Sequence, residues 1–509
     1  MTSLPTSLYT AAGVRALDRY SIDRCGIPGI QLMLRAGRAA FAELLARWPS
    51  PQHLHVFCGT GNNGGDGFVI AALAAQRNLA VTVWQVGDSA KIQGDAATAR
   101  ELAMREGVSI QLFTADGWDG AQLAPGVIVD ALLGTGLGGD VREPFTAAIA
   151  AINASGLPVF AVDIPSGLCS DSGRVLGAAV HADATLSFIG LKQGLFTGAA
   201  ADHCGVIRFA DLDAPAEAYA QVERSARLLN LADLQSLLPP RKRSAHKGSY
   251  GHVLVVGGDH GTAGAALMAA LAAGRVGAGL ISCATHVEHV AAIVSRAPEV
   301  MALGVRSGQE LIAALARASV IVIGPGIGQS AWAEQLLAEV LRTDKPLVVD
   351  ADALNLLASG KAGASRRDNW ILTPHPGEAA RLLGTSNAAI QADRFAAAAA
   401  LQARYGGAVV LKGAGSLIAA PRFEDNGIAV APYGNPGMAS GGMGDVLSGV
   451  LGGLLAQGLS LQDAAELGVC LHGHAADLAA AANGERGLLA TDLLPHLRRL
   501  VNGVGVNAC

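Results

Sequence analysis

Residues 434–449 read GNPGMASGGMGDVLSG, and this stretch decides how the second half of the chain is interpreted. Glycine loses much backbone entropy when it is fixed, so such a glycine-rich segment predicts a loop rather than the interior of a helix or strand. The residues that follow, VLSGVLGGLLAQGLS, have the apolar spacing of a buried helix. The loop is therefore expected to deliver backbone N–H groups to a helix N-terminus, where the helix dipole favours a bound anion.

Asp445 falls in the first turn of that predicted helix. The dipole stabilises its charge, so we expect a carboxylate that stays ionised near neutral pH and accepts a proton. A glycine-rich anion site beside a carboxylate is typical of phosphoryl transfer to a hydroxyl group. A lone GxGD string would more often mark an ordinary helix start, whereas the longer string is far more specific.

The composition is that of a globular α/β protein. The chain has 509 residues, of which 51% are hydrophobic and 16% charged. A chain of this length predicts two or more domains, each with its own core. The net charge of −5 gives no reason to expect a nucleic acid or an anionic membrane as partner.

Targeting signals and disulfides are not expected. The N-terminus lacks the apolar run of a signal peptide, and the longest apolar segment, residues 263–274, stops at Arg275 before it could span a bilayer. These features predict a cytoplasmic protein. The cysteines are odd in number and form no CxxC motif, so reduced thiols are expected rather than disulfides or a zinc site. They are Cys25, Cys58, Cys169, Cys204, Cys283, Cys470 and Cys509.

The first half alternates predicted strands and helices. One helix is expected to start after Thr10 and a second to cover residues 31–48, and the strand HLHVFCG then runs straight into GTGNNGGDG at residues 59–67. Strand and helix alternate further to about residue 168, which predicts a parallel sheet with crossover helices. A ligand is expected at the carboxyl ends of the strands, where the glycine-rich segments fall.

The GTGNNGGDG turn allows two interpretations. It satisfies the GxGxxG pattern of a dinucleotide-binding dehydrogenase, but its asparagines and Asp66 place polar oxygens where such a loop needs bare backbone. Asn63, Asp130 and Ser166 all lie at predicted strand ends, and together they could bind a hard cation. Taken one at a time, each more often caps a loop or helix.

The second half carries four groups that could take part in chemistry, three of them in loops after predicted strands. His375 stands between two prolines, Gly326 permits close approach of a ligand, and the KGAGS segment that starts at Lys412 offers a cation and backbone N–H groups for phosphate. Asp445 is the candidate base. Asp350 and Asp352 suit either a magnesium–phosphate complex or helix capping.

The first half resembles the YjeF N-terminal family, the NAD(P)H-hydrate epimerases, over roughly residues 8–212. The matching strings are GNNGGDG, VDALLGTGL, VDIPSGL and ADATLSFIGLKQGL. The resemblance implies a Rossmann-like αβα sandwich, a potassium ion on Asn63, Asp130 and Ser166, and a catalytic Asp163. It implies substrate contacts from Asn62, Asn63, Gly64, Gly65, Asp66, Gly134, Thr135, Gly136, Leu137, Gly138, Gly139, Asp140 and Asp163.

One segment departs from that family. The family has LMENAGR in its second helix, and this chain has LMLRAGR, with Leu34 and Arg35 in place of Glu and Asn. The departure leaves open that the first domain binds nucleotide without catalysing a reaction.

The second half resembles the YjeF C-terminal family, ribokinase-like NAD(P)H-hydrate dehydratases, across about residues 235–500. The strings GTAGAALMAA, GPGIG, VVDADALN, LTPHPGEAARLL, LKGAGS and GNPGMASGGMGDVLSG occur in the family's order. The resemblance implies that Ala265, Gly326, His375 and Asp445 contact the hydrated nucleotide, and that ADP binds with magnesium. It places the adenine nucleotide on Lys412, Gly413, Ala414, Gly415, Ser416 and Gly444.

The fused order resembles that of the bifunctional NAD(P)H-hydrate repair enzymes. We predict an epimerase domain at residues 8–215, a linker at 216–247 around the Pro-Pro pair, and a dehydratase domain at 248–509. The substrates implied are NADHX, NADPHX and ADP, although spacing alone does not separate ADP from ATP, and a homo-oligomer stays open. The alternative is a hydroxymethylpyrimidine-type kinase fused to a non-catalytic nucleotide-binding domain.

Overall fold

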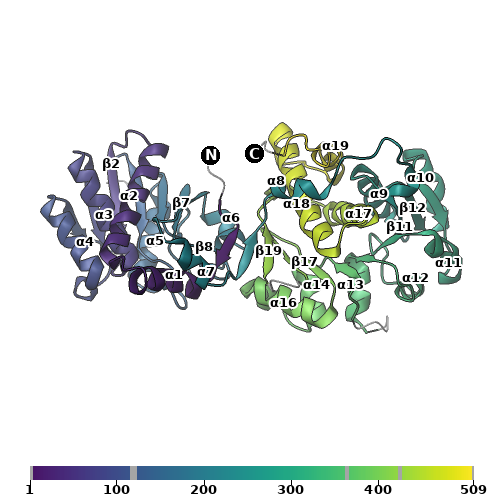
Figure 1. The fold of residues 1–509 in the computed structure, drawn as a ribbon, viewed down its shortest axis with the longest axis horizontal. Helices are drawn as coiled ribbons and strands as arrows, with labels where there is room; N and C mark the ends of the chain where they lie inside the picture. Colours follow the sequence, from purple (N-terminus) through teal and green to yellow (C-terminus); the bar gives the residue numbers. More distant parts are fainter. Residues whose placement is uncertain (1–3, 115–122, 361–365, 422–426, 507–509) are drawn as a thin grey trace. The chain divides into compact units, whose positions relative to one another are not determined.

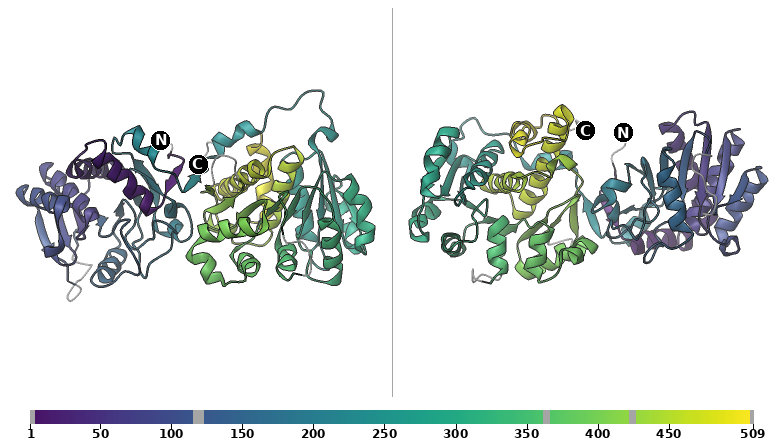
Figure 2. Two further views of the ribbon diagram at one scale, coloured as in Figure 1. Left: turned by 60° about the horizontal axis from the view of Figure 1, so that its bottom comes forward. Right: turned by 180° about the vertical axis from the view of Figure 1, so that it is seen from behind.

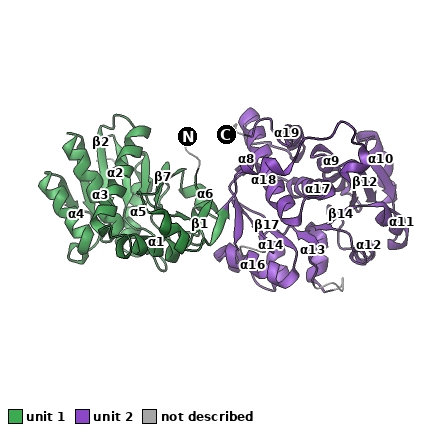
Figure 3. Ribbon diagram, viewed as in Figure 1, with its two compact units in different colours: residues 1–227 green, residues 228–509 purple. Residues whose placement is uncertain are grey.

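The computed structural model describes residues 4–114, 123–360, 366–421 and 427–506. The chain divides into two compact units, unit 1 (residues 1–227) and unit 2 (residues 228–509) (Figure 3). Each unit has its own sheet and its own buried core, and each is described by itself. The predicted α/β class is confirmed.

Unit 1 is built on a seven-stranded sheet in the order β4-β3-β2-β5-β6-β7-β9, and every neighbouring pair is parallel (Figure 1). This order reverses direction between β2 and β5, which is where a doubly wound sheet binds ligands. The strands are β2 (His53–Cys58), β3 (Ala80–Gln85), β4 (Ser109–Leu112), β5 (Val127–Ala131), β6 (Val159–Val162), β7 (Ala184–Phe188) and β9 (Val206–Ala210).

Helices cover both faces of the unit 1 sheet. In β2, Leu54 and Val56 pack with the helices of one face, whereas Phe57 packs with the helix of the other. This alternation follows from the two-residue period of a strand, and both faces are apolar because both are covered. The first layer holds α2 (Gly29–Arg47), α3 (Asn62–Gln76) and α4 (Gly94–Arg105), and the second holds α5 (Phe145–Ala154).

A smaller group of strands completes unit 1, in which β1 pairs with β8 in parallel and with β10 in antiparallel orientation. The predicted start of the first helix is confirmed, because the Thr10 side chain caps it by accepting from Gly13 N. These elements are β1 (Ser7–Tyr9), α1 (Ala11–Asp23), β8 (Leu191–Lys192), α6 (Ala200–His203), α7 (Ala216–Gln221) and β10 (Ala226–Leu228).

The sequence predicted that the glycines after β2 lie in a turn, but several of them lie in a helix. Helix α3 already begins at Asn62, so Gly64 and Gly67 lie inside it. A Cβ on Gly64 would lie 2.2 Å from Gly59 O, and one on Gly67 would lie 2.8 Å from Cys58 Sγ. These glycines therefore serve close packing of a helix on a strand end.

Unit 2 has a larger sheet in which seven strands are parallel, in the order β13-β12-β11-β14-β15-β16-β17, and β18 and β19 follow in antiparallel orientation. The antiparallel edge was not predicted, and the KGAGS segment is the turn between β17 and β18. The strands are β11 (His252–Val256), β12 (Leu280–Thr285), β13 (Met301–Gly304), β14 (Val320–Ile323), β15 (Leu347–Val349), β16 (Trp370–Leu372), β17 (Ala408–Leu411), β18 (Ser416–Ala419) and β19 (Ile428–Ala431).

One core of unit 2 lies between its sheet and four helices, and the predicted αβα layering is seen in three views (Figures 1 and 2). These four are α9 (Ala263–Arg275), α17 (Met443–Ala456), α18 (Leu461–Asn483) and α19 (Leu493–Leu500). The other helices are α8 (Leu231–Leu234), α10 (Val290–Arg296), α11 (Gly308–Arg317), α12 (Ala331–Leu341), α13 (Ala351–Ala358), α14 (Pro376–Leu383), α15 (Asn387–Ala392) and α16 (Arg394–Tyr405).

Helix α17 confirms one expectation and corrects another. It begins after Gly442, which has a left-handed φ of 92°, and Asp445 lies in its first turn as predicted. Gly444, however, lies within the helix and not in the loop, whereas Gly449 lies in the helix as its apolar surroundings predicted. A Cβ on Gly449 would lie 2.0 Å from Ala269 O of α9, so glycine is required here for close helix–helix approach.

The segment predicted as a linker, residues 216–247, is largely structured. The division between the units falls within it, and Leu229 and Leu231 are buried in the unit 2 core. Leu231 N donates a hydrogen bond of 2.8 Å to the hydroxyl of Tyr433. The partly buried leucines packed on the same core are Leu234, Leu237 and Leu238.

None of the helices within the described residues combines the length and apolarity needed to cross a bilayer. None of the cysteines that the structure describes forms a disulfide, and Cys509 lies outside the described residues. Four are buried, namely Cys58, Cys204, Cys283 and Cys470.

Candidate active sites

Unit 1 contains a cavity of about 580 Å³ at the carboxyl ends of β2 and β5, where the strand order reverses. Nine of the residues predicted to bind substrate line it: Asn62, Asn63, Asp66, Gly134, Thr135, Gly136, Leu137, Gly138 and Asp163. The other four, Gly64, Gly65, Gly139 and Asp140, are not among its lining residues.

The cavity also has a wall that the sequence did not predict. Asp18 comes from α1 and Met33 from α2, and Phe188 ends β7. Nothing in the sequence near Asp18 marks it as a site residue, because it lies in an ordinary amphipathic helix. Its role becomes visible only when α1 is placed beside the sheet.

A buried ion pair lies at this cavity. Lys192 is fully buried and its ammonium contacts the Asp163 carboxylate, while Asp163 itself lines the cavity. The ammonium also donates to Ser187 Oγ at 3.0 Å and to Phe188 O at 3.1 Å, so all three of its hydrogens are used. Lys192 thus acts as a fixed internal charge beside Asp163, and the sequence analysis had not singled it out.

Two further carboxyl groups share the cavity and hold protons unusually tightly. Burial raises the pKa of Asp18 to about 6, although the Lys192 charge opposes the shift. Burial also raises the pKa of Asp66 well above its ordinary value, and the charges of Asp163 and Asp18 add to the effect. Carboxyl groups with pKa values displaced in this way, lining one cavity, are suited to acid–base catalysis.

The three residues predicted to bind potassium lie in one connected region. Ser166 donates to both oxygens of Asp130, from Oγ at 2.6 Å and from its backbone N at 2.8 Å. Leu133 N donates to Ser166 Oγ at 2.8 Å, and a Cβ on the next residue, Gly134, would touch Asn63 at 3.4 Å. Both polar atoms of the Asn63 side chain are buried and have no hydrogen-bond partner among the residues that the structure describes.

The departures at Leu34 and Arg35 do not fall on the cavity wall. Leu34 packs against the unit 1 core, and Arg35 Nη1 donates to Leu212 O at 2.9 Å. Neither is among the residues that line the cavity. The substitutions therefore leave the carboxyl groups and the Lys192 ion pair in place.

In unit 2 a second buried ion pair joins β15 to β17. Asp350 follows β15 and is 1% exposed, and Lys412 Nζ donates to its Oδ1 at 2.7 Å. Ser448 Oγ of α17 donates to the other carboxylate oxygen at 2.7 Å. Burial alone would raise the pKa of Asp350, but the Lys412 charge and these hydrogen bonds outweigh it and hold the pKa below its usual value.

This geometry answers the question left open for the VVDADALN segment. Asp350 occupies the N-cap position of α13, yet its side chain makes no capping hydrogen bond and is committed to Lys412. Asp352 accepts from Gln329 at 2.8 Å and from Asn355 at 3.1 Å. The capping interpretation of Asp350 is therefore wrong, and its carboxylate is already neutralised by a lysine.

Two carboxyl groups near this pair have pKa values close to neutral. Burial raises the pKa of Asp445 to about 7, and the Asp350 charge adds to the shift. Burial likewise raises the pKa of Glu378 to about 7. We expected the helix dipole to keep Asp445 ionised, but that effect is worth only about 0.3–1 kcal/mol, which is less than one pKa unit. A base with a pKa near 7 is well matched to proton transfer at neutral pH.

His375 is held rigidly at the start of α14. Gly377 N and Glu378 N donate to its Nδ1 at 3.0 and 3.4 Å, and Glu378 Oε2 accepts from His375 N at 2.8 Å. The two bonds between His375 and Glu378 form a capping box. Because Nδ1 accepts a hydrogen bond, the neutral ring carries its proton on Nε2. Burial and the charges of Lys412 and Arg381 lower the pKa of His375, so the ring is a neutral donor.

The remaining predicted residues of unit 2 form two pairs of neighbours. A Cβ on Gly326 would lie 3.0 Å from Ala265 Cβ, and one on Gly444 would lie 3.3 Å from Lys412 Nζ. The buried side chain of Arg394 fixes the backbone at the KGAGS turn, because it donates to Leu411 O at 3.3 Å. Arg394 also donates to Lys412 O and Gly415 O, at 3.4 and 3.5 Å, and the sequence analysis had missed it.

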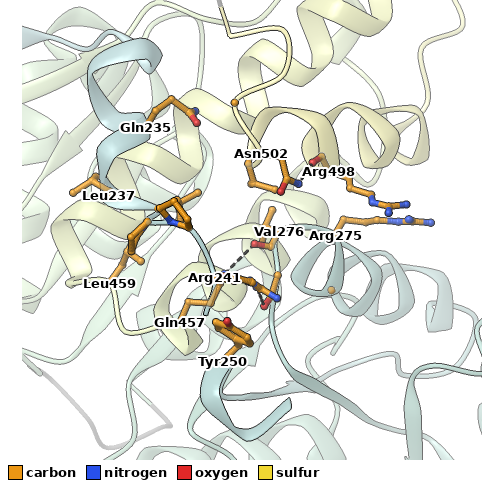
Figure 4. Close-up of a pocket in the computed structure, with 17 residues that line it drawn as sticks. Gln235, Leu237, Arg241, Tyr250, Arg275, Val276, Gln457, Leu459, Arg498 and Asn502 are labelled. Atoms are coloured by element: carbon orange, nitrogen blue, oxygen red, sulfur yellow. Dashed lines mark hydrogen bonds between the residues drawn. The ribbon is translucent and has the colours of Figure 1, made fainter. Parts of the chain in front are cut away.

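Unit 2 also has a cavity of about 690 Å³, which is lined by none of the site residues described above (Figure 4). Arg241, Arg275 and Arg498 line it, and Arg241 stacks on Tyr250 with 3.7 Å between the guanidinium carbon and the ring centroid. Tyr250 precedes β11, so this cavity is at the amino ends of the strands. It contains none of the residues predicted for the dehydratase site.

Fold and site together define a class of protein: a Rossmann-like unit followed by a ribokinase-like unit, each with an ion-paired lysine and perturbed carboxyl groups at the carboxyl ends of its strands. Comparison with known proteins narrows the class. Residues 253–499 match the family described as NAD(P)H-hydrate dehydratase, and residues 29–194 match the YjeF-related protein N-terminus.

Curated relatives extend over nearly the whole chain. The bifunctional NAD(P)H-hydrate repair enzyme of Coxiella burnetii is 51% identical over 98% of this chain and all of its own length. The enzyme of the same description from Escherichia coli is 44% identical over 98% of this chain and 95% of its own. The chain belongs to the family of bifunctional NAD(P)H-hydrate repair enzymes.

A solved structure agrees with the fold of unit 2. A ribokinase-like superfamily protein from Enterococcus faecalis, 30% identical, superposes with a TM-score of 0.50 over 55% of this chain and 96% of its own. The family assignment places the second half with the dehydratases and not with the hydroxymethylpyrimidine-type kinases that the sequence had left open.

Proposed function

We propose that unit 1 interconverts the R and S epimers of NAD(P)HX, and that unit 2 dehydrates the S epimer to NAD(P)H with ADP as phosphoryl donor. Membership of the family over nearly the whole chain supports both activities. The observation that carries the dehydratase is Asp445, a carboxyl group with a pKa of about 7 in the first turn of α17. The buried free thiols support a reducing, cytoplasmic setting.

Dehydration needs an activated leaving group, because hydroxide leaves a carbon atom poorly. Asp445 takes the proton of the substrate hydroxyl as its oxygen attacks the terminal phosphorus of ADP, and AMP departs with the bridging oxygen. The ring carbon–oxygen bond then breaks, and its electrons leave with phosphate. The neighbouring ring carbon loses a proton, which restores the double bond of NAD(P)H without any change of oxidation state.

The start of α17 and the KGAGS turn supply the setting for this transfer. The first N–H groups of α17 have no side-chain cap, so they are available to the transferring phosphoryl group. Lys412 presents its ammonium beside Gly444, and the turn held by Arg394 carries the adenine nucleotide. Magnesium carried with ADP would supply neutralisation of the phosphate charges.

The test is recovery of absorbance at 340 nm from purified S-NADHX with ADP, with ATP and with neither nucleotide. Asp445→Asn keeps the shape of the side chain but cannot take the proton, so dehydration should fall by about 10²–10⁴. Asp352→Asn is the matched control, since Asp352 is bonded only to Gln329 and Asn355 in the described structure. An Asp445→Asn enzyme that dehydrates at the wild-type rate would disprove the assignment, and retained ADP binding would show that the site is intact.

For epimerisation the carboxyl groups of the unit 1 cavity are the candidate acid and base. Asp66 holds its proton and gives it to the substrate hydroxyl, so that water leaves as the ring nitrogen forms an iminium ion. Water then adds to the other face of the ring and loses a proton to Asp18. Asp163, paired with Lys192, orients the substrate and stabilises the positive ring.

Potassium is proposed at Asn63, Asp130 and Ser166. The fit rests on the buried Asn63 oxygen, which lacks a partner in the described structure, and on the neighbouring Asp130 carboxylate. A bound cation would supply a fixed positive charge beside the substrate. Asn63→Ala should remove the potassium dependence of both epimerisation and thermal stability, with sodium as the control ion, and leave dehydration of pure S epimer unchanged. Equal loss of both activities would contradict two separate sites.

A further inference from the structure

Two histidines and a glutamate of unit 2 meet although no metal-binding spacing in the sequence relates them. His260 lies between β11 and α9, and His286 and Glu288 follow β12. Because β11 and β12 are parallel neighbours, their carboxyl ends bring these two segments together. The three residues are called the His260 cluster below.

The side chains of the His260 cluster already converge. The ring centroids of His260 and His286 are 4.0 Å apart, and His260 Nδ1 lies 3.4 Å from Glu288 Oε2. One possible ligand atom from each of the three residues lies within 4.8 Å of the other two. Zinc binds imidazole nitrogen and carboxylate oxygen at about 2.0–2.2 Å, so its ligand atoms stand roughly 3.4 Å apart. The exposed side chains of His260 and Glu288 need only small rotations to reach that spacing.

His286 is the member that a simple surface ion pair does not explain. Its Nδ1 is buried and has no hydrogen-bond partner among the described residues. A buried polar atom without a partner costs about 1–3 kcal/mol, and such atoms often mark an unoccupied ligand position. The ion pair between His260 and Glu288 provides no partner for the His286 ring, whereas a metal ion shared by the three residues would also bind that ring.

The backbone around the His260 cluster is fixed by other contacts. Asp259 N donates to Gly326 O at 2.7 Å, and His289 Nδ1 lies 3.1 Å from Gly258 O. The indole of Trp332 packs against the His286 ring, with 5.9 Å between centroids. The ligands therefore sit on positioned segments, and only side-chain torsions need to adjust.

We propose that His260, His286 and Glu288 bind a divalent first-row transition-metal ion, for which Zn²⁺ is the reference. Two imidazoles and one carboxylate favour Zn²⁺, Ni²⁺ and Cu²⁺ over Mg²⁺, which prefers oxygen ligands. Three protein ligands leave one coordination position open. The His260 cluster contains none of the carboxyl groups used in the proposed reactions, and the proposal does not depend on the proposed function.

The test is titration of the full-length protein with ZnCl₂ by isothermal calorimetry, repeated with MgCl₂. His286→Asn should weaken Zn²⁺ binding by at least about tenfold, since even a lost outer-shell partner costs 10–100-fold. Glu288→Gln should act in the same direction, and it changes only an exposed side chain. His181→Gln is the matched control, because His181 also stacks on a histidine but its Nδ1 already bonds to Asp202 O.

A second readout locates the ion. Cu²⁺ bound at the His260 cluster should quench the fluorescence of Trp332, and this component should vanish in Trp332→Phe and in His286→Asn. Zinc affinity and copper quenching that are equal in wild type, His286→Asn and Glu288→Gln would overturn the proposal. Binding that disappears only when cysteines are alkylated would overturn it as well, because it would assign the metal to thiols.

Discussion

Each unit contains a lysine–aspartate ion pair, but the more deeply buried partner is the lysine in unit 1 and the aspartate in unit 2. Unit 1 buries its lysine, with Lys192 1% exposed, and turns Asp163 toward the cavity with 14% exposed. Unit 2 buries its carboxylate, with 2% of the Asp350 side chain exposed, and leaves 20% of the Lys412 side chain exposed. Each pair neutralises itself, so what differs is the charge that the substrate meets.

That inversion suits the two chemistries. In the proposed mechanisms a carboxylate facing the unit 1 cavity would stabilise a positive ring during epimerisation, and an ammonium in unit 2 would stabilise phosphate. Each unit also holds two protonatable carboxyl groups near its pair, Asp18 and Asp66 in one and Glu378 and Asp445 in the other. The comparison suggests that the buried partner fixes the field and the exposed partner meets the ligand.

The comparison assumes that each unit can fold by itself. Truncation of the chain tests this assumption, and it has the largest expected effect on stability. Residues 228–509 should fold alone, whereas residues 248–509 should lose about 3–6 kcal/mol from the two buried leucines, Leu229 and Leu231. Total stability is typically only about 5–15 kcal/mol, so this loss is a large fraction of it, and the shorter fragment should unfold at a clearly lower urea concentration. Solubility and urea unfolding of the two fragments provide the measurement. Equal stability would show that the leucine segment contributes nothing.

The second test removes each buried lysine. Lys412→Met leaves the Asp350 carboxylate buried without its counter-ion and should destabilise unit 2 by about 3–5 kcal/mol. Lys192→Met should cost less, about 1–3 kcal/mol, because Asp163 can be hydrated from the cavity. Hydrogen exchange of each unit in the full chain measures both effects, with the exposed Lys242→Met as control.

A double variant sharpens that result. Lys412→Met with Asp350→Leu should recover most of the lost stability, since it removes the isolated charge as well. If the single Lys412→Met variant were as stable as wild type, the pair would not be the fixed charge that we describe.

The third test compares the pH profiles of the two activities. Below the pKa of its general base, each rate should fall about tenfold per pH unit. A general base works only when it is deprotonated, so each rate should rise as pH increases through the pKa of its base. The acid limb of dehydration should therefore lie near pH 7, set by Asp445, and that of epimerisation near pH 6, set by Asp18. In Asp18→Asn the epimerisation limb should flatten while the dehydration limb stays in place. Coincident limbs would contradict separate bases.

Much of the fold was predictable because it depends on local patterns. Alternating apolar strands and helices identified the parallel sheets, polar residues at strand ends pointed to Asn63, Asp130 and Ser166, and the glycine-rich string placed Asp445 in the first turn of a helix. Asp163 was predicted only from the family resemblance. The antiparallel β18 and β19 were missed, since a short apolar strand does not reveal its direction.

The electrostatics of the sites were less predictable because they arise from contacts between distant segments. The pairs Lys192–Asp163 and Lys412–Asp350 join residues far apart in the chain, and no local spacing relates them. The same holds for the pKa of Asp445, which burial and the Asp350 charge raise although its position in the helix favours ionisation.

The close packing of α17 on α9 has a consequence for how the enzyme is made. Gly449, Gly452 and Gly453 each cost about 1 kcal/mol of helix propensity relative to alanine, so α17 is a poor helix by itself and owes its form to α9 and the sheet. An isolated peptide of this sequence should bind no phosphate. During synthesis, unit 1 emerges first and can fold first. The anion site of unit 2 forms later, because α17 ends at residue 456 and must pack against α9, a helix synthesised nearly two hundred residues earlier.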